Sequence, residues 1–266
     1  MSLTLDQIRR VAPSVFADRP WHEVSERYSF IPTLHVVESL LDDGFEVSSA
    51  RQSRTHTAGK ENFVKHQLRL RRRGEPGIAG EAVPEVLLQN CHSADGAFVL
   101  MAGIFRFACF NGCYAGQSFG DVRVRHTGSI GDVVNATYQI VGEFPRLIDT
   151  VQQWRSIQLL PDEQMLLSAK ALSLRYSNGN EPIGPEQALW ACRPEDRGND
   201  LWTVYNRLQE NLTQGGIPGR NTSGRRTRTR AVTGIDENTT LNRALWSLAE
   251  GFANLKHGAI LEEVAA

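Results

Sequence analysis

The residues best suited to chemistry are arginines and lysines that gather in three parts of the chain where acidic residues are nearly absent. Guanidinium groups, hydroxyl groups and free backbone N–H groups are donors that phosphate oxygens accept hydrogen bonds from. The three parts therefore predict contacts with the phosphate backbone of nucleic acid. We expect these contacts from Lys65, Arg69, Arg71, Arg73, Arg123, Arg125, Arg220, Arg225, Arg226, Arg228 and Arg230.

The first two of these parts have the alternation of half-buried strands. Between residues 63 and 73 every second residue is a cation or a glutamine, and in residues 121–125 Arg123 and Arg125 alternate with valines. Successive side chains of a strand point to opposite faces, so the cations of each strand would form a row opposite an apolar face. The alternative interpretation is a solvated strand face that discourages edge-to-edge aggregation.

The third part, residues 219–230, contains five arginines, no acidic residue, and glycine, threonine, serine and asparagine between the arginines. We expect a loop here, between two helices. Arginine side chains, hydroxyl groups and exposed backbone N–H groups of such a loop would clamp phosphates. The alternative is a mobile, solvated loop with no ligand.

A second group of residues could hold a metal ion or supply a nucleophile: Cys91, His92, Asp95, Cys109, Cys113 and His126. Cys91 and His92 are neighbours, so in a strand their side chains would point to opposite faces. The separation of Cys109 from Cys113 lies at the wide edge of zinc-ligand spacing. Buried cysteines and hydrogen-bonded histidines explain this group better, and we expect no metal ion or other cofactor.

The elements that position these residues change character at about residue 130. Helical spacing predicts short helices within 3–16, ended early by Pro13, and over 32–43, ended by Gly44. Period-two alternation then predicts antiparallel strands over 45–54, 63–73, 84–90, 98–110 and 121–126. Asn111-Gly112 is the strongest hairpin signal in the chain.

After Gly131 the apolar spacing becomes helical, with a break expected at Pro145. Further helices are expected over 165–174, after Gly184-Pro185, over 201–212 and over 241–255. The predicted fold class is α+β, with a mainly antiparallel β-sheet in the N-terminal half and a helical C-terminal half. We expect residues 1–130 and residues 131–266 to pack together as one unit.

Composition excludes several classes of protein. The chain has 266 residues, 41% of them hydrophobic, which is enough for a core. Its 29 basic and 30 acidic residues leave a net charge of −1, so binding to an anion must come from local clusters. Four cysteines are too few for a secreted disulfide scaffold, and no signal peptide or membrane span is evident. We therefore expect a cytoplasmic protein without a membrane partner.

Several motifs, in order, resemble the domain of unknown function 932 family. They are Gln89-Asn90-Cys91-His92, Gly103 to Gly112, Arg123 to Gly128, Arg193 to Asp196, Asn206 to Asn211, Gly215-Gly216, Arg228-Thr229-Arg230 and Leu241 to Trp246. The likeness extends from about residue 27 to 252. It implies a protein carried by plasmids, prophages and conjugative elements, and no established activity. Cys91 stands where the family more usually has serine.

Three functions follow from these residues. The first is a nucleic-acid-binding protein of mobile genetic elements that binds single-stranded DNA through a basic sheet face and the arginine-rich loop. The second is a metal-dependent nucleic-acid hydrolase that uses His92, Asp95 and His126. The third is a non-enzymatic protein whose arginine loop binds a host factor. The sequence favours a binding protein over an enzyme, and it leaves homo-oligomerisation open.

Overall fold

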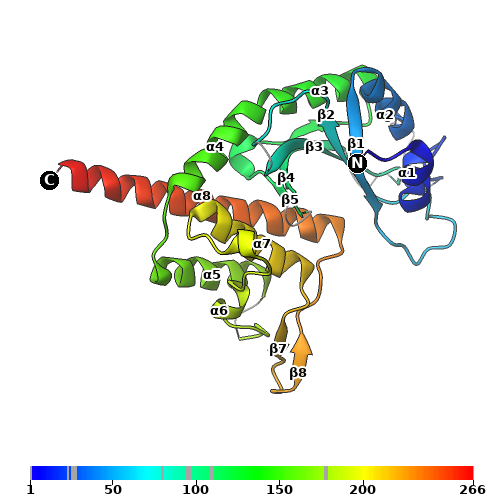
Figure 1. Ribbon diagram of the computed structural model, residues 1–266. Coiled ribbons are helices and arrows are strands. Elements are labelled where there is room, and N and C mark those ends of the chain that lie inside the picture. The colour runs from blue at the N-terminus through cyan, green and yellow to red at the C-terminus, as the bar shows by residue number, and fades with distance from the viewer. Residues whose placement is uncertain are drawn as a thin grey trace. The chain divides into compact units, whose positions relative to one another are not determined.

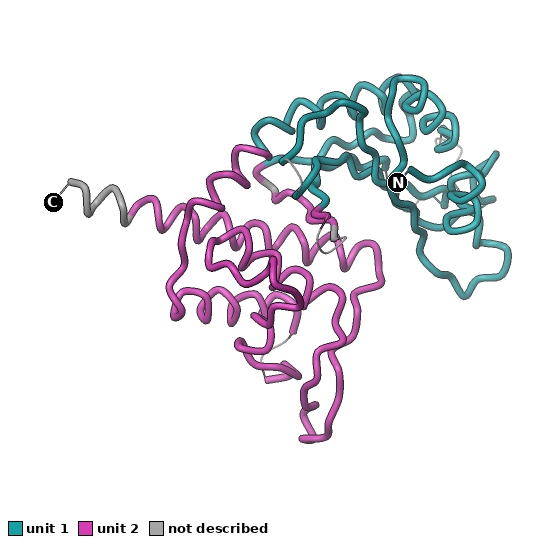
Figure 2. The backbone as a smooth tube through the Cα atoms, viewed as in Figure 1, with its two compact units in different colours: residues 1–105, 119–147 teal, residues 106–118, 148–266 magenta. Residues whose placement is uncertain are grey.

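The computed structural model describes residues 2–22, 24, 29–78, 81–93, 97–107, 111–176 and 179–265, without the side chains at 111, 117 and 259–265. The chain forms two compact units (Figure 2). Unit 1 contains residues 1–105 and 119–147, and unit 2 contains residues 106–118 and 148–266. The chain passes from unit 1 to unit 2, returns to unit 1 and then enters unit 2 again, so each unit consists of two segments.

Unit 1 is built on an antiparallel sheet in which β1, β2, β3 and β4 are neighbours in that order, and β6 pairs with β4 (Figure 1). The strands are β1 (Phe45–Gln52), β2 (His66–Arg72), β3 (Ala82–Asn90), β4 (Phe98–Arg106) and β6 (Val122–Val124). In β2 the apolar residues Leu68 and Leu70 are fully buried and are spaced two apart, as the sequence predicted.

Three α-helices and a 3₁₀ turn pack on this sheet: α1 (Leu5–Val11), the turn Pro13–Phe16, α2 (Thr33–Asp42) and α3 (Ile130–Gly142). Capping boxes at Thr4 and Ser129 satisfy the first backbone N–H groups of α1 and α3. Val36 and Leu40 of α2 and Val133 of α3 are fully buried, so the helices close the core of unit 1.

Unit 2 is mainly helical, and α7 is its central element. The helices of unit 2 are most of α4 (Phe144–Ser156), α5 (Pro161–Arg175), α6 (Pro185–Ala188), α7 (Leu201–Gln214) and α8 (Ile235–Ala265). Its short strands are β5 (Asn111–Tyr114), β7 (Pro218–Arg220) and β8 (Arg226–Arg228). Residues 201–213 of α7 are buried on every face. Trp154, Trp202, Tyr205 and Trp246 form a core of rings, with Trp154 and Trp246 centroids 4.6 Å apart.

The α+β fold class predicted from the sequence is confirmed, and so are most element positions. Three local predictions were wrong. Asn111-Gly112 begins β5 instead of forming a two-residue turn, the arginine-rich segment forms a β-hairpin instead of a loop, and the last helix extends over residues 235–265. The hairpin strands have only three residues each, and none of these residues is buried, so the alternation of apolar and polar residues could not reveal them. No described helix is long and apolar enough to cross a membrane.

Gly215 ends α7 and fixes where the chain turns towards the hairpin. Its φ of 67° lies in the left-handed region, and a Cβ atom there would come within 2.6 Å of the carbonyl carbon of Arg230. Only glycine satisfies both conditions. The end of α7 and the end of the hairpin are therefore in direct contact.

We predict that Gly215→Ala lowers the free energy of unfolding by at least about 1–3 kcal/mol, because it adds backbone strain and a clash. The matched control is Gly251→Ala, within α8, where nothing lies within 4 Å and φ is not positive. That change should stabilise the protein by about 0.5–1 kcal/mol. Urea denaturation of both variants measures the difference, and equal effects would contradict the assignment.

Candidate nucleic-acid interface

The β7–β8 hairpin places three arginines on one face. Its register pairs Pro218 with Arg228, Gly219 with Thr227 and Arg220 with Arg226. Residues directly opposite each other in an antiparallel ladder project to the same side, and so do residues two apart along a strand. Arg220, Arg226 and Arg228 therefore share a face, and two of these cations are opposed directly across the ladder.

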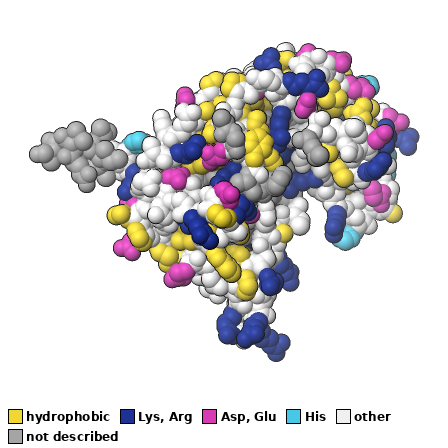
Figure 3. All heavy atoms as spheres, viewed as in Figure 1, with side chains coloured by type: hydrophobic (Ala, Val, Ile, Leu, Met, Phe, Trp, Pro, Cys, Tyr) yellow, Lys and Arg dark blue, Asp and Glu magenta, His cyan; other side chains and the backbone are white. Residues whose placement is uncertain are grey.

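The arginines of the hairpin segment are not ion-paired within the part of the chain that the structure describes. Arg220, Arg225, Arg226, Arg228 and Arg230 are all exposed, and none is ion-paired to a described carboxylate. Arg220 Nη1 donates to the carbonyl of Gly224 at 2.8 Å, and Arg228 Nη1 donates to that of Gly216 at 2.6 Å. These bonds orient the two side chains but do not neutralise their charge, because a carbonyl group is uncharged. Dark-blue side chains gather at the end of the hairpin in Figure 3.

The hairpin is anchored to the body of unit 2. Gln187 Nε2 donates to the carbonyl of Pro218 at 2.9 Å, and the backbone N–H of Arg220 donates to the carbonyl of Pro182 at 2.8 Å. A Cβ atom at Gly219 would lie 2.0 Å from that same carbonyl oxygen, so glycine permits the close approach. The arginines are thus carried by a fixed ribbon and not by a solvated loop.

Unlike the hairpin arginines, two of the predicted cations of β2 are paired with a buried acid. The side chain of Glu85 is fully buried and accepts hydrogen bonds from Arg69 Nη1 at 3.0 Å, Arg71 Nε at 2.6 Å and Ser48 Oγ at 2.8 Å. Arg71 also lies over the ring of Phe105, 4.3 Å from its centroid. Burying a carboxylate requires such partners, so Arg69 and Arg71 are held in a structural network.

The remaining predicted cations of unit 1 are divided. Arg73 Nε is 2.7 Å from Glu46, and Arg123 Nε is 2.7 Å from Asp121, so both are ion-paired at the surface. Arg125 is exposed and has no ion-pair partner among the described residues, and Lys65 is half-buried. Unit 1 therefore does not present a continuous row of unpaired cations in the part of the chain that the structure describes.

The catalytic candidates His92 and His126 are both buried, and Asp95 lies outside the described residues. His92 and His66 share the hydroxyl of Thr33, with Nε2 to Oγ1 distances of 3.1 and 3.0 Å. Asn90 Nδ2 donates to the same oxygen at 2.9 Å. This is a buried hydrogen-bond network inside unit 1, and it also includes Ser14, whose Oγ lies 3.0 Å from His66 Nδ1.

The network accommodates both imidazoles in the neutral form, which burial favours. His66 Nδ1 lies 3.3 Å from the carbonyl of Val64, so Nδ1 carries the proton and Nε2 accepts from the Thr33 hydroxyl. The hydroxyl oxygen then accepts from Asn90 and from His92 Nε2–H, which fills its two acceptor positions. Burial lowers the pKa of His66 to about 4, and burial together with the nearby His66 lowers that of His92 to about 2.

The cysteines do not come together with these histidines in a described metal site. No group of three His, Cys, Asp or Glu side chains suited to a metal ion occurs among the residues that the structure describes. Cys91 Sγ lies 3.1 Å from Ser93 Oγ in unit 1, Cys113 is buried in unit 2, and Cys109 lies outside the described residues.

The acidic residues around position 196 form a capping and ion-pair network. Asp196 is buried and pairs with Arg106 and with Arg193, the latter at 3.2 Å. Asp200 Oδ1 accepts from the backbone N–H of Thr203 at 2.9 Å and caps α7. These side chains stabilise unit 2 and are not free to bind a metal ion.

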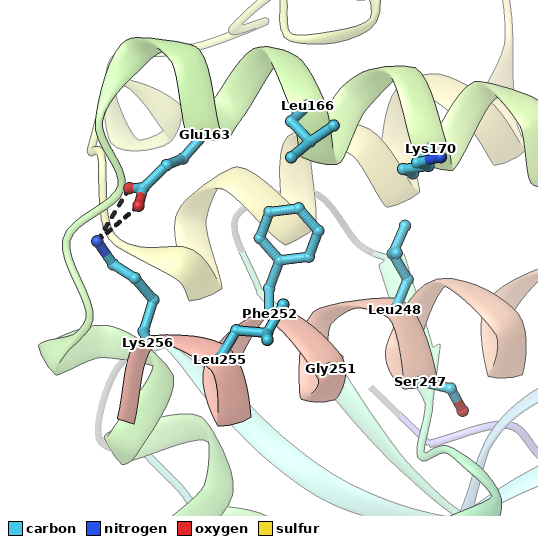
Figure 4. Close-up of a pocket in the computed structure, with 9 residues that line it drawn as sticks. All are labelled: Glu163, Leu166, Lys170, Ser247, Leu248, Gly251, Phe252, Leu255 and Lys256. Atoms are coloured by element: carbon cyan, nitrogen blue, oxygen red, sulfur yellow. Dashed lines mark hydrogen bonds and ion pairs between the residues drawn. The ribbon is translucent and has the colours of Figure 1, made fainter. Parts of the chain in front are cut away.

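A groove of about 650 Å³ lies between α5 and α8 of unit 2 (Figure 4). Leu166 and Phe252 point towards each other across it, and Lys256 Nζ bonds both carboxylate oxygens of Glu163 at 2.8 and 3.0 Å at one end. Its lining is mostly apolar. This chemistry suits apolar side chains, and the groove offers little to a phosphate.

The fold and these side chains define an α+β protein with a cationic β-hairpin on its helical unit. The chain belongs to the domain of unknown function 932 (DUF932) family, whose model matches residues 20–246. It is 42% identical to the UPF0380 proteins YafZ and YfjQ of Escherichia coli (strain K12), over 249 residues that cover 93% of this chain and 90% of each relative. No solved structure matches it.

We predict that acid destabilises unit 1 through the two buried histidines. Folding lowers the pKa values of both histidines. Their contribution to the free energy of unfolding is therefore complete above pH 6.5 and is lost as the pH falls from 6.5 towards 4. Between pH 8 and about pH 5 the loss reaches up to about 4 kcal/mol.

Urea denaturation between pH 8 and about pH 5 measures this slope. His66→Gln should make it shallower, whereas His35→Gln, which changes an exposed histidine, should leave it unchanged. A slope that is the same in the wild type and in His66→Gln would contradict the neutral network.

Proposed function

We propose that the protein binds nucleic acid through the arginines of the β7–β8 hairpin, with single-stranded DNA as the ligand. The observation that carries the proposal is that the segment from Arg220 to Arg230, which contains the hairpin, has five exposed arginines, none of them ion-paired to a carboxylate among the described residues. A phosphate backbone supplies the missing negative charge and accepts the donors of each guanidinium.

The directly opposed pair, Arg220 and Arg226, supports a polyanionic ligand. Like charges opposite each other in a ladder destabilise it, by roughly 0.2–1 kcal/mol. A phosphate between them relieves this repulsion, so a feature that weakens the free hairpin strengthens the complex. Because the chain as a whole has a net charge of −1, the attraction is local to this hairpin.

Single-stranded DNA fits the spacing of the cations. Side chains on one strand face recur every ~7 Å, and a flexible strand can bring successive phosphates to such a row. In this proposal the arginines contact phosphates and not the edges of bases, so binding would be largely independent of nucleotide sequence. The family resemblance suggests a setting in the maintenance or transfer of plasmid and prophage DNA.

We predict that replacing Arg225, Arg226 and Arg228 together by Gln weakens binding to a labelled single-stranded oligonucleotide by about tenfold or more at low salt. The slope of log affinity against log salt should fall in magnitude by about 2, since each lost phosphate contact on a single strand contributes about 0.7. Fluorescence anisotropy over a range of salt concentrations measures both quantities.

The matched control replaces Arg10, Arg19 and Arg54, which are exposed on unit 1 and have no ion pair with a described carboxylate, by Gln. It removes the same charge from elsewhere in the chain and should change the affinity by less than about twofold. Equal losses in the two triple variants would show a general charge effect and would remove the hairpin from the proposal.

A further inference from the structure

Trp190 is an exposed tryptophan in unit 2, with 61% of its surface accessible. Trp154, Trp202 and Trp246 of the same unit are at most 2% exposed. An exposed indole ring leaves a large apolar face in water, and Trp is enriched where such a face meets a ligand. The packing of unit 2 does not use this ring, whereas it uses the other three.

The backbone that carries Trp190 is held in place. The carbonyl of Trp190 accepts from Asn211 Nδ2 at 2.9 Å, and the same amide donates to the carbonyl of Ala188 at 2.8 Å. Asn211 is a buried residue of α7, and the N–H of Trp190 donates to the carbonyl of Gln187 at 3.2 Å. The backbone beneath the exposed ring is therefore held in place, so little conformational entropy is lost when a ligand covers the ring.

The same segment supports the arginine hairpin. Gln187, three residues before Trp190, donates from Nε2 to the carbonyl of Pro218 in β7. Three residues span at most about 11 Å, so the Cα atom of Trp190 lies within that distance of the residue that contacts the hairpin. The segment that carries Trp190 is therefore in direct contact with the hairpin.

We propose that Trp190 is a stacking platform for a nucleobase of a single strand whose phosphates the hairpin holds, an inference that rests on the proposed function. A flat exposed aromatic ring stacks with any base, and the bases of a duplex are not accessible to it. Glu186, exposed on α6, repels phosphate near Trp190. The bound DNA would therefore place a neutral base at Trp190 and its phosphate backbone at the hairpin. Trp190 thus confers the preference for single strands.

The test compares two ligands with the same phosphates: a 20-nucleotide thymidine oligonucleotide and a 20-nucleotide abasic strand. The wild type should bind the thymidine strand about tenfold more tightly than the abasic strand. Trp190→Ala should remove this difference and leave the abasic affinity unchanged, whereas Trp190→Phe should retain most of it. Leu160→Ala, which truncates another exposed apolar side chain of unit 2, is the matched control and should change neither affinity.

Each outcome bears on one of the two proposals. If the wild type binds neither strand at low salt, the proposed function fails. If it binds both strands equally, or if Trp190→Ala keeps the full preference for thymidine, the proposed function stands and the stacking role of Trp190 is overturned. Quenching of tryptophan emission by the thymidine strand in the wild type, absent in Trp190→Phe, supports the role independently of any change in folding. Quenching that persists unchanged in Trp190→Phe opposes it.

Discussion

The constraint on which unit 2 depends is that α7 is buried on all sides although it carries polar side chains. A buried polar group without a hydrogen-bond partner destabilises the fold, and several of these side chains find their partners on other elements. Gln209 Nε2 donates to Asn242 of α8 at 2.7 Å and Arg207 Nη2 to Gln164 of α5 at 3.1 Å. Asn211 Nδ2 donates to the carbonyl of Ala188, the last residue of α6, and to that of Trp190. The sequence motif that contains these residues, Asn206 to Asn211, therefore ties the helices of unit 2 to one another.

The C-terminal end of this helix also positions the surface features that we connect with function. The carbonyl of Thr213 accepts from Val232 just after the hairpin at 2.8 Å, and Gly215 contacts the backbone of Arg230. Asn211 holds the segment that presents Trp190. The arginine hairpin and the exposed indole thus have a common support, and a change in α7 would affect both.

Arginine has two roles in this protein, and its neighbours decide which. Arg69 and Arg71 compensate the buried carboxylate of Glu85, and their removal would leave a charge buried without a partner. Arg226 and Arg228 are exposed, are not paired with a described acid, and lie beside another arginine. The histidines show the same dependence, because His66 and His92 complete a hydrogen-bond network around Thr33 in the core instead of facing solvent.

The order and type of most elements followed from the sequence alone, because the periods of 2 and 3.6 record which residues face a core. The family motifs and the acid-free arginine segment were also evident there. The sequence could not show that Glu85 lies between Arg69 and Arg71, that residues 218–220 and 226–228 pair as strands, or that Gln187, near Trp190, bonds to the hairpin. These relations join residues up to tens of positions apart, and a side chain's exposure and partners are properties of the folded chain. Tertiary structure therefore decided which cations remain available to a ligand.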